Sequence, residues 1–450
     1  MKKIFCLITL TCMLFSSVAC SNGSTSTTTG STEVESKSDS TEAPKQTGEK
    51  VKLTAPNLGY NDDQIAAAEA REEGLNDLDR YHMAVRESIG KNYPDYEVEY
   101  VDWGWAETLD QKQRSMFASG DIPDLIAGEV FIPTYAFEGI LEPLPDDIVD
   151  LVNPAFLIYD KDNKAVALAH RTSIFMLFYN KTLLEKAGLD PESPPKTWAE
   201  FQEYSEAVTA AGNGEYWGGG IPSFPHAGGA FRSSPFFRQM GTDYGNGTDS
   251  NLDDPKFHET LEFIRTMNQN LPAGLGNGAD EGPLWNAFDK DQTVAFIING
   301  SWEASSAEQN GVDWGVAPLP LPPNGVVGNC TVASVFLAVP AEAPNKEASF
   351  NLIRESIREE NLKHLINGTF PVPLNSMIED TSLYEDNSTL VVAMEAIANG
   401  TYTSLSFFPK NDSQIWDILN TKVLARTTMT NDPIADICSE AKTEIDALLG

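Results

Sequence analysis

The chain has 450 residues, enough for two globular domains, and its 31 Lys and Arg stand against 66 Asp and Glu, a formal net charge of -35 at pH 7. A surface with this excess of negative charge repels phosphate backbones and anionic lipid headgroups. The composition therefore excludes nucleic-acid binding and electrostatic docking on a membrane, and it favours a neutral or cationic ligand over a strongly anionic one.

The first residues have the pattern of an export signal. Two lysines precede an apolar run over 4–15, and small residues lead to Cys20. The sequence SSVAC resembles the lipobox of bacterial lipoproteins, although Ser17 stands where that pattern usually has Leu. The resemblance implies removal of residues 1–19, acylation of Cys20 with chains such as palmitate, and anchoring to the outer face of the bacterial cell membrane. An ordinary signal peptide with an incidental cysteine is the alternative.

Residues 20–49 follow the signal and contain Ser, Thr, Gly and charged side chains, with almost nothing apolar to bury. Such a composition predicts a disordered segment. A flexible coil of this length spans about 30 Å on average. The segment therefore suits a tether between a lipid anchor at Cys20 and a folded body.

Strands and helices alternate in the first part of the folded chain. The patterns predict strands over 51–55 and 96–101, with one long polar helix over 64–91 between them. A helix that ends at Gly120 and a strand that begins near Pro123 follow. This alternation predicts an α/β architecture with a mostly parallel sheet.

The stretch 173–201, SIFMLFYNKTLLEKAGLDPESPPKTWAEF, predicts a strand, a short helix, a rigid turn and a second helix. Its apolar start, 174–179, is too short for a membrane span and has the character of a buried strand. The short helix should end at Gly188 in a left-handed cap. After the proline-rich turn, Thr197 can cap the second helix, and Glu200 completes a capping box.

The rest of the chain continues this alternation. Segment 214–245 is rich in glycine and aromatic residues and is predicted to be a loop, and 333–340 is predicted to be a strand. Helices are predicted over 198–211, where Gly212 would close the helix, over 255–268 and 346–366, and from Asp432 and Pro433 to Leu449.

Several of these motifs resemble one family. YNKTLLEKAGL followed by PPKTWAEF is similar to the signature segment of the family 1 bacterial extracellular solute-binding proteins, the maltose-binding-protein-like receptors of ABC importers. FIINGSWE, within 287–306, and DWGVAPLPLPPNG, over 313–325, resemble two further segments of that family. The motifs occur in the family's order across about 51–450.

The resemblance implies a type II periplasmic-binding-protein-like clamshell, in which two α/β lobes are joined by three hinge crossings near 170, 325 and 374. One lobe would comprise 50–172 with 326–374, and the other 173–325 with 375–450. The implied function is the capture of an extracellular carbohydrate, with an oligosaccharide favoured, in the cleft between the lobes. The protein would deliver this ligand to an ABC permease as a monomer, without a cofactor.

The candidate ligand contacts follow from the chemistry of a sugar, whose apolar C–H faces suit aromatic rings and whose hydroxyls suit carboxylate, amide and Arg groups. Trp302 is the leading candidate, because it follows a strand end and the resemblance places a stacking Trp in this turn; the resemblance also favours Trp416. The other candidates lie in predicted loops or near strand ends: Asn57, Trp103, Trp105, Glu129, Phe131, Phe224, His226, Arg232, Asn299 and Phe408. Packing in the core or a salt bridge is the competing interpretation for each.

Enzymatic motifs are absent from the sequence: it has no GxSxG elbow, HExxH, Walker A loop or Cys/His cluster, so neither catalysis nor a metal site is predicted. Cys330 and Cys438 remain in the folded part, and the sequence does not decide whether they pair. Two alternatives stay open. The same fold could bind a peptide, a polyamine or another solute, or the protein could be a secreted glycan hydrolase.

Overall fold

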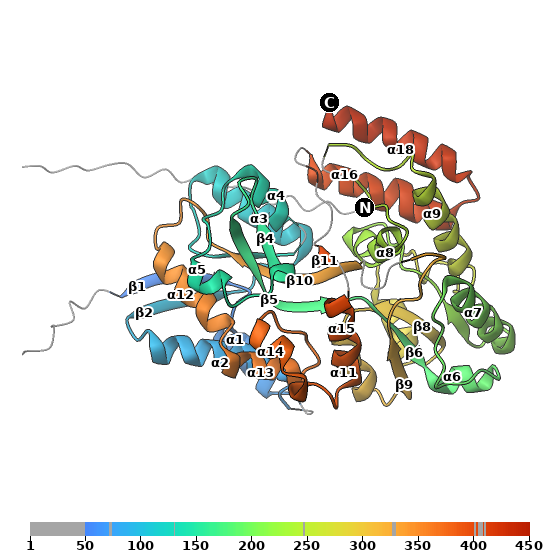
Figure 1. Cartoon of the computed structure of the whole chain (residues 1–450), viewed down its shortest axis with the longest axis horizontal. Helices are drawn as coiled ribbons and strands as arrows, with labels where there is room; N and C mark the ends of the chain where they lie inside the picture. The colour runs from blue at the N-terminus through green and yellow to red at the C-terminus, as the bar shows by residue number, and fades with distance from the viewer. Residues whose placement is uncertain are drawn as a thin grey trace, which may run out of the picture. The chain divides into compact units, whose positions relative to one another are not determined.

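The computed structural model describes residues 50–71, 74–129, 131–245, 248–325, 330–399, 402–403, 408 and 411–450. The predicted signal peptide, the lipidation site Cys20 and the tether lie outside these residues. Within the described part, helices and strands alternate in a mixed α/β arrangement (Figure 1). The predicted fold class is confirmed at this level.

The strands of the described part form three sheets. β1 (Val51–Pro56) and β2 (Tyr96–Val101) pair in parallel. The second sheet contains β3 (Ile126–Gly128), β4 (Leu157–Tyr159), β5 (Ala165–Ile174), β10 (Cys330–Ala338) and β11 (Tyr402–Thr403). The third sheet contains β6 (Met176–Asn180), β7 (Trp217–Gly219), β8 (Val294–Asn299) and β9 (Trp314–Ala317).

The prediction of a mostly parallel arrangement is wrong for the second and third sheets. β5 runs directly into β6, with only Phe175 between them, so the chain passes from one sheet to the other without a loop. β9 and β10, which follow later in the chain, pair antiparallel to β6 and β5. The outgoing and returning segments therefore lie side by side in opposite directions. The predicted lobe boundaries and hinge crossings stay predictions.

The buried hydrophobic side chains form two clusters, and β6 contributes to both. Met176 and Phe178 belong to the cluster that contains the second sheet, and Leu177 and Tyr179 belong to the other. Successive strand residues point to opposite faces of a sheet. All five residues of β6 are buried, so both faces of this strand are covered, which explains its unbroken apolar sequence.

Each of two long predicted helices is divided in two. The segment 64–91 forms α1 (Asp62–Glu69) and α2 (Asp77–Asn92), because Gly74 has a left-handed φ of 80° and Asn76 caps α2. The segment 346–366 forms α12 (Lys346–Ser356) and α13 (Glu359–Asn367), separated by an extended Arg358.

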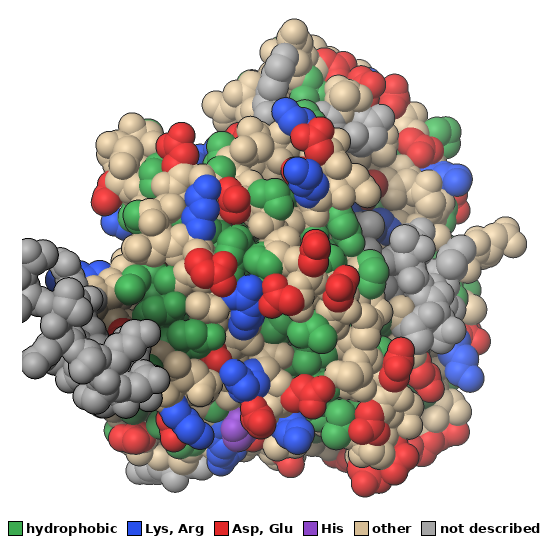
Figure 2. All heavy atoms as spheres, turned by 60° about the vertical axis from the view of Figure 1, so that its left-hand side comes forward, with side chains coloured by type: hydrophobic (Ala, Val, Ile, Leu, Met, Phe, Trp, Pro, Cys, Tyr) green, Lys and Arg blue, Asp and Glu red, His purple; other side chains and the backbone are tan. Residues whose placement is uncertain are grey.

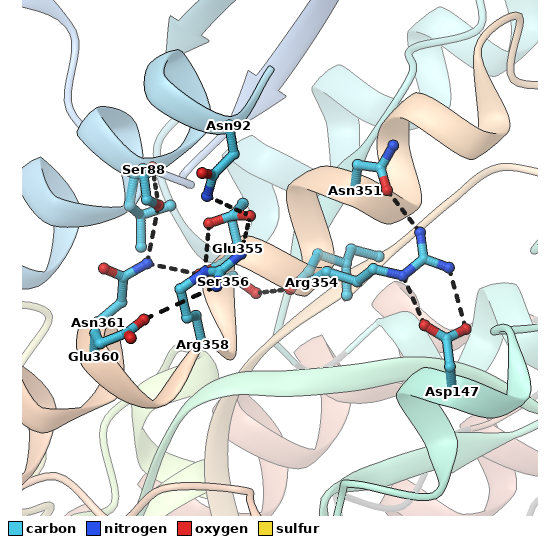
Figure 3. A network of polar contacts seen from close by, with 12 residues as sticks. Ser88, Asn92, Asp147, Asn351, Arg354, Glu355, Ser356, Arg358, Glu360 and Asn361 are labelled. Carbon is cyan, nitrogen blue, oxygen red and sulfur yellow. Dashed lines mark hydrogen bonds and ion pairs between the residues drawn. The ribbon is translucent and has the colours of Figure 1, made fainter.

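A polar network holds α2, α12 and α13 together (Figure 3). Glu355 on α12 is fully buried and accepts hydrogen bonds from Arg358 at 2.6 Å and from Asn92 on α2 at 3.1 Å. Burial alone would raise the pKa of Glu355, but these hydrogen bonds and the charge of Arg358 hold it below its usual value. On the same helix, Arg354 forks onto Asp147 at 2.8 and 3.1 Å.

The unit predicted over 173–201 is confirmed in detail. α6 (Lys181–Lys186) follows β6, and Gly188 has a φ of 77°. Thr197 caps α7 (Trp198–Gly212), and the reciprocal capping box with Glu200 is present. The helix ends one residue later than predicted, because Asn213 rather than Gly212 takes the left-handed position.

The prediction that 214–245 is a loop is wrong, since the segment contains β7 and α8 (Ala227–Gln239). The helix starts at the N-cap His226, whose ring nitrogen accepts a hydrogen bond from the Gly228 N–H at 3.2 Å. It includes Pro235 and two glycines, and most of its residues are buried. Tertiary packing therefore outweighs the low helix propensity of this segment.

The remaining helices complete the layers around the sheets. α18 packs against both α9 and α16 (Figure 1). The start of α9 at Pro255 and the end of α18 at Leu449 match the prediction, and α18 begins at Ile434, one residue after its N-cap Pro433. The bounds are α3 (Ala106–Ser119), α4 (Ile132–Glu138), α5 (Asp146–Val149), α9 (Pro255–Asn268), α10 (Gly282–Asp289), α11 (Trp302–Gln309), α14 (Asn375–Glu379), α15 (Ser388–Asn399), α16 (Asp412–Ile418), α17 (Arg426–Met429) and α18 (Ile434–Leu449).

The described surface is charged but mixed. On the face that Figure 2 shows, Lys and Arg side chains are interspersed among Asp and Glu. Among the described residues, no helix has both the length and the apolar character that crossing a bilayer requires. Cys438 is buried, and its thiol is free.

Two glycines allow a test of how tightly α7 packs on the third sheet. A Cβ at Gly218 on β7 would lie 2.2 Å from the Ser205 backbone oxygen of α7, so Gly218→Ala should destabilise the protein by roughly 1–3 kcal/mol. At the exposed Gly90 in α2, a Cβ meets nothing within 4 Å. Gly90→Ala should therefore stabilise the protein by roughly 0.5–1 kcal/mol. Urea unfolding followed by circular dichroism measures both changes, and equal effects would contradict the packing.

Candidate functional site

A cavity of about 300 Å³ lies where β5 leaves the second sheet. Ligand sites for small molecules range from about 300 to 1,000 Å³, so this cavity suits a small solute. Its lining comes from segments far apart in the sequence: Leu78, Trp105, Glu129, Arg171, Thr172, Ser173, Phe231, Trp302, Ser334, Val335 and Phe370.

The strand β5 supplies the floor of the cavity and also holds its walls. The Thr172 hydroxyl donates to the Pro371 carbonyl at 2.8 Å, which ties down the turn that carries Phe370. The Ser173 hydroxyl accepts from the Ser301 N–H at 2.7 Å, directly before Trp302. Short polar side chains on one strand therefore position two of the aromatic walls.

Trp302 begins α11 and packs edge to face on Phe175, with ring centroids 6.4 Å apart. Its indole N–H donates to the side-chain amide oxygen Oδ1 of Asn299 at 3.0 Å. A Cβ at Gly300 would lie 2.3 Å from the indole, so glycine is required where the ring folds back over the chain. Phe231 of α8 continues this aromatic wall, with its ring 4.9 Å from that of Phe175.

Arg171 brings a positive charge to the cavity. Its guanidinium carbon lies 5.2 Å from the ring centre of Trp105, which is 44% exposed. Burial lowers the pKa of Arg171, and the nearby negative charge of Glu129 opposes that effect. A cation on an aromatic face with a carboxylate nearby can orient the hydroxyl or charged groups of a ligand.

Two buried histidines lie behind Arg171. Its Nη1 is 3.3 Å from His82 Nε2, and the His82 ring stacks on Tyr60 with centroids 4.7 Å apart. Burial, with the positive charge of Arg171, holds the pKa values of His82 and His170 well below the usual range. His82 is therefore neutral at pH 7, and its Nε2 can accept the hydrogen bond from Arg171.

Arg232 and Asn299 form the support behind Trp302. Arg232 is buried, pairs with Glu281 at 2.8 Å and lies 4.8 Å from the ring centre of Trp285. Its Nε lies 3.4 Å from the same Asn299 oxygen that accepts the indole N–H. Burial lowers the pKa of Arg232, and the charge of Glu281 opposes this.

The structure brings some of the predicted residues together and separates others. Trp302, Trp105 and Glu129 line the cavity, and Arg232 and Asn299 contact each other directly behind Trp302. The rest lie outside the cavity lining: Asn57, Trp103, Phe131, Phe224, His226, Phe408 and Trp416.

Local contacts explain the placement of this second group. Phe408 and Trp416 pack against each other in the core of the third sheet, and Phe224 is buried against His226, with centroids 5.3 Å apart. Phe131 is also buried, beside Gly128. The other two face different partners: Lys112 lies over the Trp103 ring, and the Asn57 amide donates to the Gly104 carbonyl.

Sequence reasoning missed the contribution of β5 and of Phe370. A signal was present, because His-Arg-Thr-Ser at 170–173 interrupts an otherwise apolar run over 165–179. Polar and charged groups inside a buried strand require partners, and such groups concentrate at functional sites. For Leu78 and Ser334 no comparable signal exists.

This α/β architecture, with a cavity where the chain passes from one sheet to another, is that of a solute-binding protein fold. Residues 79–361 match the family described as bacterial extracellular solute-binding protein, and the chain belongs to that family. The predicted resemblance is confirmed.

Relatives of established name share part of the chain. Over 250 residues, 53% of this chain, it is 26% identical to the maltotriose-binding protein of Pyrococcus abyssi. Over 282 residues, 55% of this chain, it is 23% identical to the sn-glycerol-3-phosphate-binding periplasmic protein UgpB of Yersinia pestis. These alignments span 51% and 61% of the two relatives, so the chain matches only part of their length.

Solved structures share the fold over most of the chain. A solute-binding protein of an ABC transporter from Thermotoga lettingae, bound to α-D-tagatose, has a TM-score of 0.71 at 20% identity and covers 89% of this chain and 100% of its own. UgpB from Mycobacterium tuberculosis, in complex with glycerophosphocholine, has a TM-score of 0.67 at 16% identity, covering 89% and 98%. Both support the type II periplasmic-binding-protein fold.

Removal of the positive charge of Arg171 should change the pKa of His82. In Arg171→Met the positive charge that disfavours the imidazolium is gone, so the pKa of His82 should rise, although burial keeps it below its usual value. Buried neutral histidines with lowered pKa values stabilise the fold above their unfolded pKa and lose that contribution as the pH falls. Because the His82 pKa in Arg171→Met lies closer to its unfolded value, the free energy of unfolding of the variant should fall less than that of the wild type as the pH is lowered.

An NMR pH titration of the five histidines measures this change, together with unfolding midpoints between about pH 7 and pH 4. His258, whose Nε2 contacts the Leu252 carbonyl, is the internal reference. An unchanged His82 titration in Arg171→Met would contradict the contact.

Proposed function

We propose that this protein is the substrate-binding component of an ABC importer and that it captures a carbohydrate in the cavity beside β5. The observation that carries the proposal is the lining: the rings of Trp105, Trp302, Phe231 and Phe370 surround a space that also receives Arg171, Glu129 and three hydroxyl side chains. Rings suit the C–H faces of a sugar, and the polar groups suit its hydroxyls.

The setting of the cavity supports the same proposal. The family consists of extracellular binding proteins, and one named relative binds maltotriose. A neutral sugar meets no repulsion from a chain with a net charge of -35. We infer that the protein closes two lobes, 50–172 with 326–374 and 173–325 with 375–450, over the ligand. It would then deliver the ligand, as a monomer, to the permease without making or breaking a bond.

A second ligand class has a specific observation in its favour. Arg171 supplies a cation beside an aromatic ring, and this pairing also suits a phosphodiester or phosphate-bearing glycerol compound. Relatives named for sn-glycerol-3-phosphate fit this alternative. The Glu129 carboxylate disfavours this anionic ligand class, because its negative charge already interacts with the positive charge of Arg171.

A melting screen separates the two ligand classes. The panel consists of maltose, maltotriose, mannobiose and tagatose, with glycerophosphocholine and sn-glycerol-3-phosphate as the second class. A ligand at 100 times its Kd adds about 2.7 kcal/mol to the free energy of unfolding. Stabilisation by the saccharides supports the first proposal, and stabilisation by the phosphate compounds alone overturns it in favour of the second.

Two tryptophan variants test the site with whichever probe binds. Trp302→Ala and Trp105→Ala should each raise the Kd for that probe about tenfold or more, because each removes a ring from the cavity lining. A factor of ten corresponds to about 1.4 kcal/mol of binding free energy. Trp103→Ala is the matched control, since Trp103 lies two residues from Trp105 but outside the lining. Titration calorimetry measures all three, and an equal loss in Trp103→Ala would contradict the assignment.

We also propose that export and acylation of Cys20 attach the protein to the outer face of the cell membrane, on the strength of the SSVAC motif. Cys20→Ser should abolish incorporation of labelled palmitate and move the protein from the membrane fraction to the soluble fraction. A variant that still sediments with membranes would show that another feature holds the protein there.

A further inference from the structure

Two carboxyl groups are buried together behind Trp302. Asp289 ends α10 and is 5% exposed, and Glu303 is the second residue of α11 and is 3% exposed. The two carboxyl groups are close enough that Asp289 helps to raise the pKa of Glu303, after burial. Neither lines the cavity, and no role described above uses them.

A continuous chain of hydrogen bonds connects this pair with the cavity. The Ser306 hydroxyl donates to Asp289 Oδ2 at 2.5 Å, and the Asn299 amide NH₂ donates to Glu303 Oε2 at 2.6 Å. The other end of that amide accepts the Trp302 indole N–H at 3.0 Å. Two hydrogen-bonded groups therefore meet at the carboxyl pair: Ser306 bonds to Asp289, and Glu303 is linked through Asn299 to Trp302.

The chemistry of the donors fixes the direction of these hydrogen bonds. The indole of Trp302 and the guanidinium of Arg232 can only donate, so the oxygen of the Asn299 amide must face them. Its NH₂ group then faces Glu303, whose Oε2 must accept. The amide can hold the indole in this way only while Glu303 stays in place.

The remaining oxygens of the pair require a proton. Asp289 Oδ1 and Glu303 Oε1 are both buried and, as carboxylates, find no donor among the described residues. One shared proton between them satisfies both, whereas two carboxylates in contact repel each other in a medium of low dielectric constant. A proton on Glu303 therefore removes this repulsion and supplies the missing donor.

The surrounding charges do not replace this proton. Arg232 of α8 faces Glu303, but Arg232 is already paired with Glu281 at 2.8 Å, and the charge of Glu129 acts on it too. Burial, followed by the contact with Asp289, raises the pKa of Glu303 to about 9 despite Arg232. The proton is thus present at neutral pH.

We propose that Glu303 is a positioning residue for the ligand site: the proton it shares with Asp289 keeps Asn299, and through Asn299 the indole of Trp302, in the orientation that faces the cavity. The functional meaning rests on the proposed role of Trp302 in ligand binding. The structural claim can be tested without a ligand.

The proposal determines the sign of a pH effect. Below about pH 9 the pair keeps its proton, and Trp302 stays held. When the pH rises through this value, Glu303 becomes negatively charged and is repelled by Asp289. Asn299 then no longer fixes the orientation of the Trp302 indole. Because the folded pKa is raised, the contribution of the pair to stability is likewise lost as the pH rises.

The test uses the full-length protein labelled with 5-fluorotryptophan, whose eight tryptophans give separate ¹⁹F resonances. Trp302→Phe identifies the resonance of interest. In the wild type this resonance should shift with a midpoint at about pH 9. In Glu303→Gln the amide supplies the donor to Asp289 and the acceptor for Asn299, so the resonance should match the wild type at pH 7 and stay constant up to pH 10.5.

Controls make the outcome decisive. Glu308→Gln, at an exposed position of the same helix, should keep the wild-type midpoint. If Glu303→Gln does not fold, Asp289→Asn serves instead. Its amide donates to Glu303 and removes the contact between two carboxyl groups, so the transition should move below the wild-type midpoint. Circular dichroism over the same range excludes unfolding.

A Trp302 resonance that does not respond to pH in the wild type, or one that responds equally in the wild type and Glu303→Gln, would overturn the proposal. Neither result depends on ligand binding. Failure of this inference is therefore distinguishable from failure of the carbohydrate proposal, which the melting screen tests.

Discussion

The antiparallel pairing of β5 with β10 is the constraint on which the site depends. Ser173 pairs with Ala333 and Thr172 with Ser334, so two passages of the chain, more than a hundred and fifty residues apart, are fixed at the same level. The hydroxyls of Thr172 and Ser173 then hold the turns that carry Phe370 and Trp302. The cavity exists because this pair of strands is also the place where the chain leaves one sheet for the next.

Buried polar groups around the cavity cost folding free energy, but their hydrogen bonds fix the orientation of neighbouring side chains. A polar group taken out of water costs free energy unless it finds a partner. His170 meets the Tyr81 hydroxyl at 2.8 Å, and Arg171 meets His82. Asn299 serves Trp302 and Glu303 at once. Arg171 and Trp302, which line the cavity, are therefore each held by a second residue, which restricts the orientations of their side chains.

Local charge in this protein differs from the charge of the whole chain. The net charge of -35 is that of the whole chain, and on the face that Figure 2 shows, Lys and Arg are interspersed with Asp and Glu. The cavity instead receives Arg171, with Arg232 behind Trp302. Each guanidinium has a carboxylate acting on it, Glu129 and Glu281 respectively. The charge next to the cavity is therefore balanced locally, unlike the net charge of the chain.

The sequence by itself determined the features that depend on a few neighbouring residues. The capping box of Thr197 and Glu200, the left-handed Gly188 and the buried strand before them follow from local rules of backbone geometry, and the family motifs carried the fold class with them. Trp302 belongs here too, since its place after a strand end was readable. The antiparallel order of the larger sheets was not, because it depends on where the chain returns.

Only the tertiary structure decided which rings and charges face the cavity. Trp105 and Trp103 are separated by one residue, yet one lies under Arg171 at the cavity and the other under Lys112 outside it. Trp416 and Phe408 satisfy the same compositional criteria as Trp302 but pack in a core. The reason is physical: burial and pairing depend on residues brought together by long-range contacts, and a linear pattern contains no record of which partner a side chain will meet.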